Sequence, residues 1–284
     1  MRNVLIAWFS VNGTTTAIAE RIAVGLQKAG CSVTPCRIGS QKPPDVAPFD
    51  LVGIGTPTYF FRPPFVVTDF LRSLPDLRGK RSFAFVLHGT DRGACANRVR
   101  KALVRKNAVD LGLFHSYGPD IVDGFLRRGV LFSPDTPTAR DLDAAEQFGT
   151  SLTERGPGGA RVPEPMDGPT HFMYAIERLF ANRALARLLW SRRFHADDRC
   201  DACGVCVSAC PVHNIESRNG DRPRWGNQCL LCVTCELRCP KDAIHSPFDW
   251  PVFAPFATYD IRKSERDGIP FARVTHCGGV TRRL

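Results

Sequence analysis

The sequence predicts an α/β protein, with a doubly wound parallel sheet in its first half and a smaller α+β domain after it. Three observations support this prediction. Short apolar runs alternate with helical patterns up to residue 154. A stretch at 156–169, where eight of fourteen residues are Gly or Pro, then disfavours both helix and central strand. A repeat rich in cysteine follows it, and 284 residues suffice for about two domains.

The elements of the first half follow from the period of their apolar residues. The strand candidates are residues 4–9, 33–36, 51–55, 83–87 and 117–122, and the helix candidates are residues 15–29, 64–73, 94–111 and 138–154. On the first helix Ile18, Ile22 and Leu26 recur at four-residue spacing and form one buried stripe. Strands joined by helical crossovers predict a parallel sheet, whose ligand site lies beyond the carboxyl ends of the strands.

Eight of the twelve cysteines form an internal repeat with an offset of 29 residues. Both copies read C-x2-C-x2-C-x3-C-P, the spacing typical of bacterial ferredoxins with two clusters, in which the fourth cysteine binds the other cluster. We therefore predict one 4Fe-4S cluster on Cys200, Cys203, Cys206 and Cys239, and a second on Cys229, Cys232, Cys235 and Cys210. The alternative is structural zinc, which usually takes two separated pairs of ligands and fits a triple C-x2-C-x2-C poorly.

The segment at about 196–248 resembles the dicluster ferredoxin domain, including the isoleucine that follows each C-P pair, Ile215 and Ile244. The resemblance implies that both isoleucines pack beside a cluster. It also implies that the clusters are needed for folding, because such a domain has a small apolar core.

A polar loop, Ser10-Val11-Asn12-Gly13-Thr14-Thr15, joins the first strand to the first helix. Hydroxyl and amide side chains at a helix amino terminus, together with unpaired backbone N–H groups, suit a phosphate. The loop lacks both the glycine spacing of a dinucleotide fingerprint and the G-K-[ST] of a nucleoside triphosphate site.

Two further loops follow the third and fourth predicted strands, Thr56-Pro57-Thr58-Tyr59 and His88-Gly89-Thr90. With these three loops, residues 1–154 resemble a flavodoxin, and the whole chain resembles the flavodoxin–ferredoxin fusion proteins of anaerobic microbes. The resemblance implies a sheet of order 2-1-3-4-5, FMN as cofactor, and Tyr59 as the side chain that stacks on the flavin. Val11 departs from the family's S-x-T-G-x-T loop, and a positive φ at this β-branched residue would be strained. The residues that the resemblance assigns to FMN are Ser10, Asn12, Gly13, Thr14, Thr15, Thr56, Pro57, Thr58, Tyr59, His88, Gly89, Thr90 and Gly93.

These patterns divide the chain into a flavodoxin-like FMN domain at 1–155, a linker with Arg-rich helices at 156–195, a dicluster domain at 196–250 and a tail at 251–284. The helical stretch at 172–193 changes its apolar face, which predicts a break near Asn182. The sequence of the tail predicts no function for it. Cys31, Cys36, Cys95 and Cys277 have no metal spacing and are interpreted as inert thiols.

The net charge of +10 is divided evenly, because residues 1–154 carry 19 basic and 14 acidic side chains and residues 155–284 carry the same numbers. This pattern indicates a solvated basic surface, and no motif predicts a nucleic-acid partner. The stretch at 172–193 would suit a membrane surface or an acidic partner, but we favour helices packed between the domains. The first apolar run is too short for a signal peptide, so we expect a cytoplasmic protein.

The cofactors predict an electron-transfer flavoprotein that passes electrons between the two clusters and FMN and on to a redox partner protein. No acid, base or nucleophile of the chain is required for this, so an electron carrier is favoured over a substrate-specific enzyme. One alternative is an FMN-dependent reductase of a small organic substrate, with Tyr59, Arg62 or His88 near the ring as proton donors or anchors. Another alternative is a cluster-bearing carrier with a vestigial flavodoxin domain.

Overall fold

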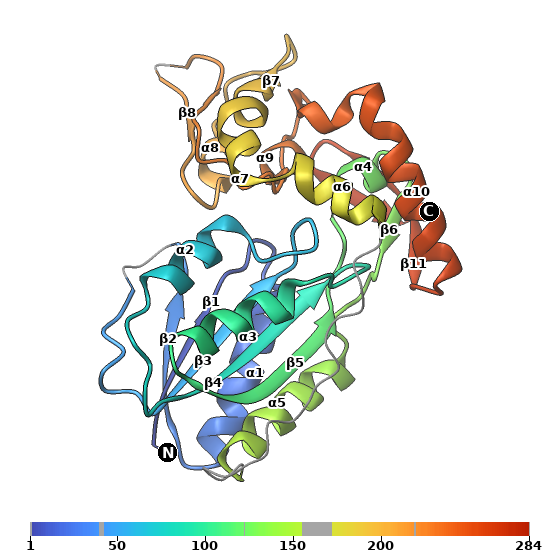
Figure 1. Cartoon of the computed structure of the whole chain (residues 1–284). Helices are drawn as coiled ribbons and strands as arrows, with labels where there is room; N and C mark the ends of the chain where they lie inside the picture. Colours follow the sequence, from blue (N-terminus) through green and yellow to red (C-terminus); the bar gives the residue numbers. More distant parts are fainter. Residues whose placement is uncertain (1, 40–42, 122, 155–171, 219, 284) are drawn as a thin grey trace. The chain divides into compact units, whose positions relative to one another are not determined.

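A computed structural model describes residues 2–39, 43–121, 123–154, 172–218 and 220–283 (Figure 1). The chain divides into two compact units, each of which is described by itself. The first unit contains the described residues up to Gly118 and those at 135–154, and the second contains 119–134 and the described residues from 172 onward. The predicted linker at 156–169 lies outside the described residues.

The first unit is a five-stranded parallel sheet of order β2-β1-β3-β4-β5, as predicted. Val4 lies opposite Val33 on one side and opposite Leu51 on the other, which fixes the register of the three strands at one half of the sheet. The strands are β1 (Asn3–Trp8), β2 (Ser32–Arg37), β3 (Leu51–Pro57), β4 (Arg81–His88) and β5 (Val109–Tyr117). The helices of this unit are α1 (Thr14–Lys28), α2 (Phe65–Ser73), α3 (Cys95–Arg105) and α5 (Ala139–Glu154).

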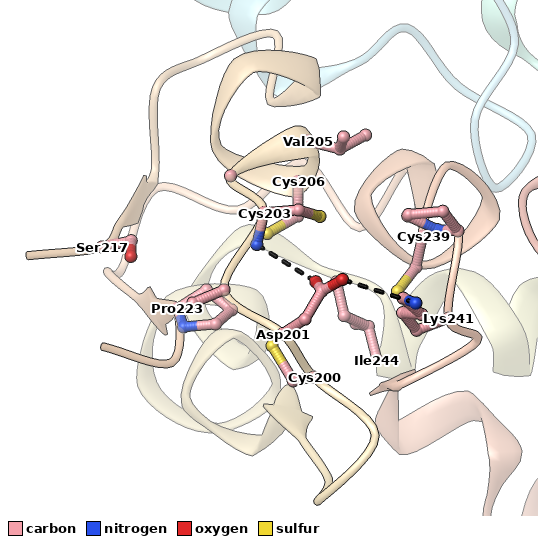
Figure 2. A pocket seen from close by; sticks show the side chains of 13 residues that line it. Cys200, Asp201, Cys203, Val205, Cys206, Ser217, Pro223, Cys239, Lys241 and Ile244 are labelled. Atoms are coloured by element: carbon pink, nitrogen blue, oxygen red, sulfur yellow. Dashed lines mark hydrogen bonds and ion pairs between the residues drawn. The ribbon is translucent and has the colours of Figure 1, made fainter. Parts of the chain in front are cut away.

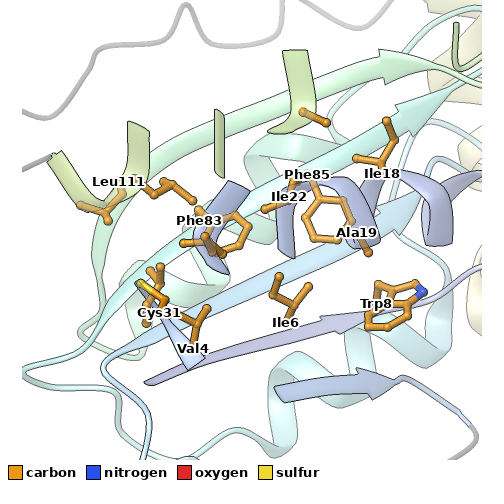
Figure 3. Packing of buried hydrophobic residues seen from close by; sticks show 14 of the residues in the cluster. Val4, Ile6, Trp8, Ile18, Ala19, Ile22, Cys31, Phe83, Phe85 and Leu111 are labelled. Carbon is orange, nitrogen blue, oxygen red and sulfur yellow. The ribbon is translucent and has the colours of Figure 1, made fainter. Parts of the chain in front are cut away.

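The apolar core of this unit lies between the sheet and the pair α1 and α5 (Figure 3). Ile18, Ile22 and Leu26 of α1 are fully buried, which confirms the predicted stripe. Phe83 and Phe85 on β4 reach across β3, where Gly53 and Gly55 leave room for their rings. A Cβ atom at either glycine would lie about 2 Å from a ring carbon. The predicted cofactor loops begin at the carboxyl ends of β1, β3 and β4.

The predicted boundary between the third helix and the fifth strand was wrong. The helix was expected to extend to residue 111 and the strand to begin at Tyr117, but α3 ends at Arg105 and β5 ends at Tyr117. Asn107 adopts a left-handed φ of +66°, which stops the helix. Leu111 and Leu113 are then buried at the two-residue spacing of a strand, and the ladder is irregular between Ser82 and Ala84 of β4.

The second unit combines residues 119–134 with the end of the chain. Its three-stranded sheet has the order β12-β11-β6, from β6 (Val130–Phe132), β11 (Phe271–Cys277) and β12 (Val280–Arg283). Phe125 of α4 (Asp123–Leu126) packs with Phe132 against α10 (Ala254–Arg266). The tail thus supplies a helix and a hairpin to this unit.

The Arg-rich stretch forms α6 (Phe172–Phe180), the single turn α7 (Arg183–Leu185), the π-helix η1 (Ala186–Trp190) and the 3-10 turn η2 (Ser191–Arg193). The predicted break is confirmed, because Asn182 has extended backbone angles and its Oδ1 accepts the N–H of Leu185 at 3.0 Å. None of the helices in the described parts of the chain is long and apolar enough to cross a membrane.

The cysteine repeat contains only short elements. Its two motifs carry α8 (Val205–Ala209) and α9 (Thr234–Leu237), and two small antiparallel pairs flank them. The pairs join β10 (Ile244–His245) to β7 (His195–Ala196) and β8 (Ile215–Glu216) to β9 (Arg224–Trp225), and the 3-10 turns η3 (Pro247–Asp249) and η4 (Pro251–Phe253) follow.

Candidate cofactor sites

One pocket of the second unit is lined by thiols from both copies of the cysteine repeat (Figure 2). Cys200, Cys203 and Cys206 come from the first motif, and Cys239 comes from the second. Ile244 also lines the pocket, where an isoleucine was expected beside a cluster. The structure thus brings together the four cysteines that the sequence assigns to one cluster.

The mouth of this pocket carries a fixed charge pair. The Asp201 carboxylate accepts the backbone N–H of Cys203 at 3.2 Å and lies 3.6 Å from Nζ of Lys241 (Figure 2). Cys203 is exposed, whereas Cys206 and Cys239 are each 7% exposed. Among the cysteines of this pocket, Cys203 is therefore the most accessible to solvent.

The other four cysteines influence one another electrostatically. Burial raises the pKa of Cys229 to about 12, and the neighbouring thiols of Cys232 and Cys210 raise it further. Burial likewise raises the pKa of Cys235 well above its usual range, with Cys232 as the next cause. Thiols with such pKa values stay protonated until a metal displaces the proton, so metal binding here is coupled to proton release.

The two motifs repeat in backbone conformation as well as in sequence. Three pairs of residues 29 positions apart have positive φ angles: Ala202 (57°) and Leu231 (58°), Gly204 (76°) and Val233 (48°), and His213 (51°) and Asp242 (47°). Left-handed angles are costly for residues with a Cβ atom and persist where the surroundings enforce them. The duplication therefore preserves one loop shape around two sets of thiols.

Backbone N–H groups point at several of the sulfur atoms. The N–H of Asn214 donates to Sγ of Cys210 at 3.2 Å, and the N–H of Ala243, 29 residues later, donates to Sγ of Cys239 at 3.3 Å. Such bonds favour the thiolate and raise the reduction potential of a cluster that the thiolate holds.

Among the described residues, no three His, Cys, Asp or Glu side chains are grouped as a single metal ion would require.

The predicted phosphate loop of the first unit is held by its own side chains. Oγ of Ser10 accepts the N–H of Gly13 at 3.1 Å, and Oδ1 of Asn12 accepts the N–H and the hydroxyl of Thr14. The positive φ angle of the loop, +89°, falls on Gly13 and not on Val11. The departure from the family pattern at Val11 therefore introduces no backbone strain of this kind.

The second loop, which follows β3, closes in a tight hairpin. Tyr59 and Arg62 exchange backbone hydrogen bonds at 2.9 and 3.1 Å, and Phe60 and Phe61 between them both have positive φ angles. Two consecutive aromatic residues in this region are strained, as is common at ligand sites. The sequence analysis did not single out this pair, although it lies inside the loop. Tyr59 meets Phe9 edge to face, with ring centroids 6.4 Å apart.

The third loop, which follows β4, packs directly against the second. A Cβ atom on Gly93 would lie 2.3 Å from Cβ of Phe61, and the N–H of Ala94 donates to the carbonyl of Phe61 at 3.0 Å. Gly93 therefore allows the second and third loops to contact each other, and this packing role does not depend on a bound cofactor. His88 is 8% exposed, and burial lowers its pKa to about 4, with the charge of His115 as the next cause, so its ring is neutral at pH 7.

Two buried hydroxyls in these loops fit a phosphorylated ligand. Oγ1 of Thr15 and Oγ1 of Thr58 are buried and have no hydrogen-bond partner among the described residues. Unpaired buried hydroxyls are costly and call for an explanation such as a ligand that they bind. The residues present therefore fit the FMN that the resemblance implies.

Arg37, the last residue of β2, stands behind the phosphate loop and was missed by the sequence analysis. One of its Nη atoms donates to the carbonyl of Ser10 at 2.9 Å, and the other donates to Oγ1 of Thr16. Its guanidinium carbon also lies 5.9 Å from the centroid of the Trp8 ring. A cationic residue at the carboxyl end of a parallel strand next to β1 was a usable signal, because these ends meet at one edge of the sheet.

Comparisons with known proteins identify two domain families in the chain. A flavodoxin domain model matches residues 5–121, and a 4Fe-4S dicluster domain model matches residues 191–244. No curated protein matches the chain. The matched domains imply FMN and two 4Fe-4S clusters as cofactors.

Several solved flavodoxins are similar to the first half of the chain. An archaeal flavodoxin is 16% identical, with 54% of this chain and 96% of that chain covered and a TM-score of 0.42. Flavodoxin 1 of Bacillus cereus is 19% identical, with 54% and 99% covered and a TM-score of 0.43. The flavodoxin of Megasphaera elsdenii is 23% identical, with 51% and 98% covered and a TM-score of 0.39.

The two family models lie one after the other in a single chain, on the sheet and on the cysteine repeat described above. The chain therefore combines a flavodoxin domain with a 4Fe-4S dicluster domain, as a flavodoxin–ferredoxin fusion does, and this combination indicates an electron-transfer iron-sulfur flavoprotein.

Proposed function

We propose that the protein carries electrons between its two 4Fe-4S clusters and its FMN and delivers them to a redox partner protein. When bound, FMN exchanges electrons in pairs or singly and each cluster exchanges one, so the set converts between paired and single electrons. The observation that carries the proposal is the pocket that gathers Cys200, Cys203 and Cys206 with Cys239 from the other motif.

The chain's own residues have distinct tasks in this proposal. The eight motif cysteines hold the clusters, and the backbone donors to Cys210 and Cys239 stabilise the thiolates. The loop from Ser10 to Thr15 binds the FMN phosphate through its hydroxyls and helix N–H groups. Because thiols and clusters of this kind persist in reducing surroundings, we place the protein in the cytoplasm of an anaerobe.

The test is internal electron transfer in the anaerobically purified full chain. A photoexcited deazaflavin reduces the protein in a flash, and absorbance then follows clusters and FMN separately. We expect electrons to move between a cluster and FMN at a rate that does not depend on protein concentration. Cys206→Ala and Cys235→Ala each remove a predicted ligand, and at least one should slow this step about tenfold or more.

Cys277→Ala is the matched control, because this cysteine is exposed and belongs to neither motif. It should leave the rate unchanged. The proposal is overturned if both ligand variants behave like the control, or if the rate rises in proportion to protein concentration. Reduction of an added organic compound at FMN, faster than internal transfer, would instead support a reductase.

A further inference from the structure

Arg127 forms the link between the segment at 119–134 and the second cysteine motif, within the second unit. Its Nη2 lies 2.7 Å from Oε1 of Glu236, the residue directly after Cys235. Its Nε lies 3.3 Å from Oδ1 of Asp249 in η3. Neither the flavodoxin nor the dicluster family model includes Arg127 or Asp249.

The carboxylate of Glu236 lies in an unusual position for a charged group. Its side chain is 2% exposed, so its charge is kept from bulk water, and it lies on the short helix α9 that carries Cys235. A buried charge requires a close partner, and Arg127 supplies one whose own side chain is 41% exposed. The pair therefore places one negative and one positive charge next to the second set of thiols.

The backbone fixes the position of Arg127. It follows α4, where Phe125 and Leu126 are 5% and 2% exposed, and Gly129 turns the chain with a φ of +73° into β6. The pairing of β6 with β11 and the apolar contacts with α10 then hold this turn in the second unit. Arg127 is thus presented to Glu236 by a rigid support.

We propose that Arg127 is a positioning residue for the cluster held by Cys210, Cys229, Cys232 and Cys235, and that it sets the reduction potential of this cluster by neutralising the buried charge of Glu236. Reduction adds a negative charge, so an uncompensated carboxylate nearby makes it less favourable and a cation makes it more favourable. The inference rests on the clusters of the proposed function.

The test is a potentiometric titration of the anaerobic full chain, with the two clusters resolved by electron paramagnetic resonance. We expect Arg127→Gln to lower the reduction equilibrium constant of one cluster about tenfold, which is about 59 mV for a one-electron couple. Glu236→Gln should raise the potential of the same cluster. The double variant should return towards the wild type, because the two charges act on each other.

Arg128→Gln is the matched control. It removes the same charge one residue later, from an exposed side chain that donates to the carbonyl of Gly124. The inference is overturned if Arg127→Gln shifts the potential no more than this control, or if it shifts both clusters equally. Iron content and the resonance signals are measured on every variant, so a chain without clusters contradicts the proposed function, whereas intact clusters with unchanged potentials contradict this inference alone.

Discussion

Replacing Thr15 by Val should change the stability of the free protein and the affinity for FMN in opposite directions. Thr15 is 1% exposed, and its hydroxyl has no hydrogen-bond partner among the described residues. An unpaired buried hydroxyl costs about 1–3 kcal/mol, and valine has nearly the same shape without the polar atom. We therefore expect the FMN-free variant to be about 1 kcal/mol more stable, a rise of about 2–4 °C in the melting temperature.

The affinity for FMN should fall, because the variant lacks a donor to the phosphate. A hydrogen bond to a charged group contributes about 1.5–3 kcal/mol, so the dissociation constant of FMN should rise about 10- to 100-fold. Quenching of FMN fluorescence on titration into the FMN-free protein measures this change, and thermal unfolding without FMN measures the first.

Thr150→Val is the control, since the Thr150 hydroxyl donates to the carbonyl of Gly25 at 3.2 Å in the same unit but outside the predicted loops. It should not gain stability and should bind FMN normally. A Thr15→Val protein that binds FMN as tightly as the wild type would show that the Thr15 hydroxyl does not bind the phosphate. A loss of stability equal to that of the control would show that the Thr15 hydroxyl is not unpaired in the FMN-free protein.

Three further predictions concern the remaining features. Gly279→Ala should lower the free energy of unfolding by about 1–2 kcal/mol more than Gly268→Ala does, and it should also lower the iron content. Both glycines have φ near +75°, but of the two only Gly279 has a neighbour that a Cβ would meet, the carbonyl of Arg238 at 3.1 Å, beside Cys239. Chemical denaturation and iron analysis measure the two effects, and equal losses of stability in the two variants would contradict this prediction. Burial raises the pKa of Asp260 to about 9 and that of Glu177 to about 7, so the folded state retains protons that the unfolded chain loses, and stability should fall as the pH rises from about 5 to 9. Asp260→Asn should make the melting temperature less dependent on pH. An unchanged pH dependence would show that the carboxyl groups of Asp260 and Glu177 are not its cause. Gly93→Ala should weaken FMN binding and destabilise the first unit, because its Cβ would overlap Phe61. Gly79→Ala, at a glycine that also has a positive φ but open space around it, should leave FMN binding unchanged. Equal FMN affinities in the two variants would show that the contact with Phe61 does not matter for FMN binding.

Local patterns accounted for most of the fold. The parallel sheet and the stripe on α1 were predicted from apolar period and helical crossovers, whereas the strand order was implied by the resemblance to flavodoxins. The cysteine spacing predicted which thiols meet in the pocket. The start of β5 was missed because its position depends on the left-handed angle of Asn107 and on burial of Leu111, which tertiary packing decides.

Contacts between distant segments were beyond the reach of these patterns. Nothing local marks residues 119–134 as part of the second unit, since β6 finds its partner β11 about 140 positions later. Arg127 contacts Glu236 and Gly279 lies against Arg238, and both contacts join residues that are far apart in sequence. The place of the tail in the second unit was therefore visible only in the structure. The flavin loops were found by resemblance, whereas the aromatic turn at Phe60 and Phe61 required the backbone angles.

One chain should hold two cubane clusters and one flavin. The cofactor content of the full chain purified without air, determined as iron, acid-labile sulfide, zinc and FMN per chain, measures this directly. We predict about eight iron, eight sulfide and one FMN. Zinc in place of iron would rule out the clusters, and a well-folded protein that takes up no FMN would rule out the flavin site.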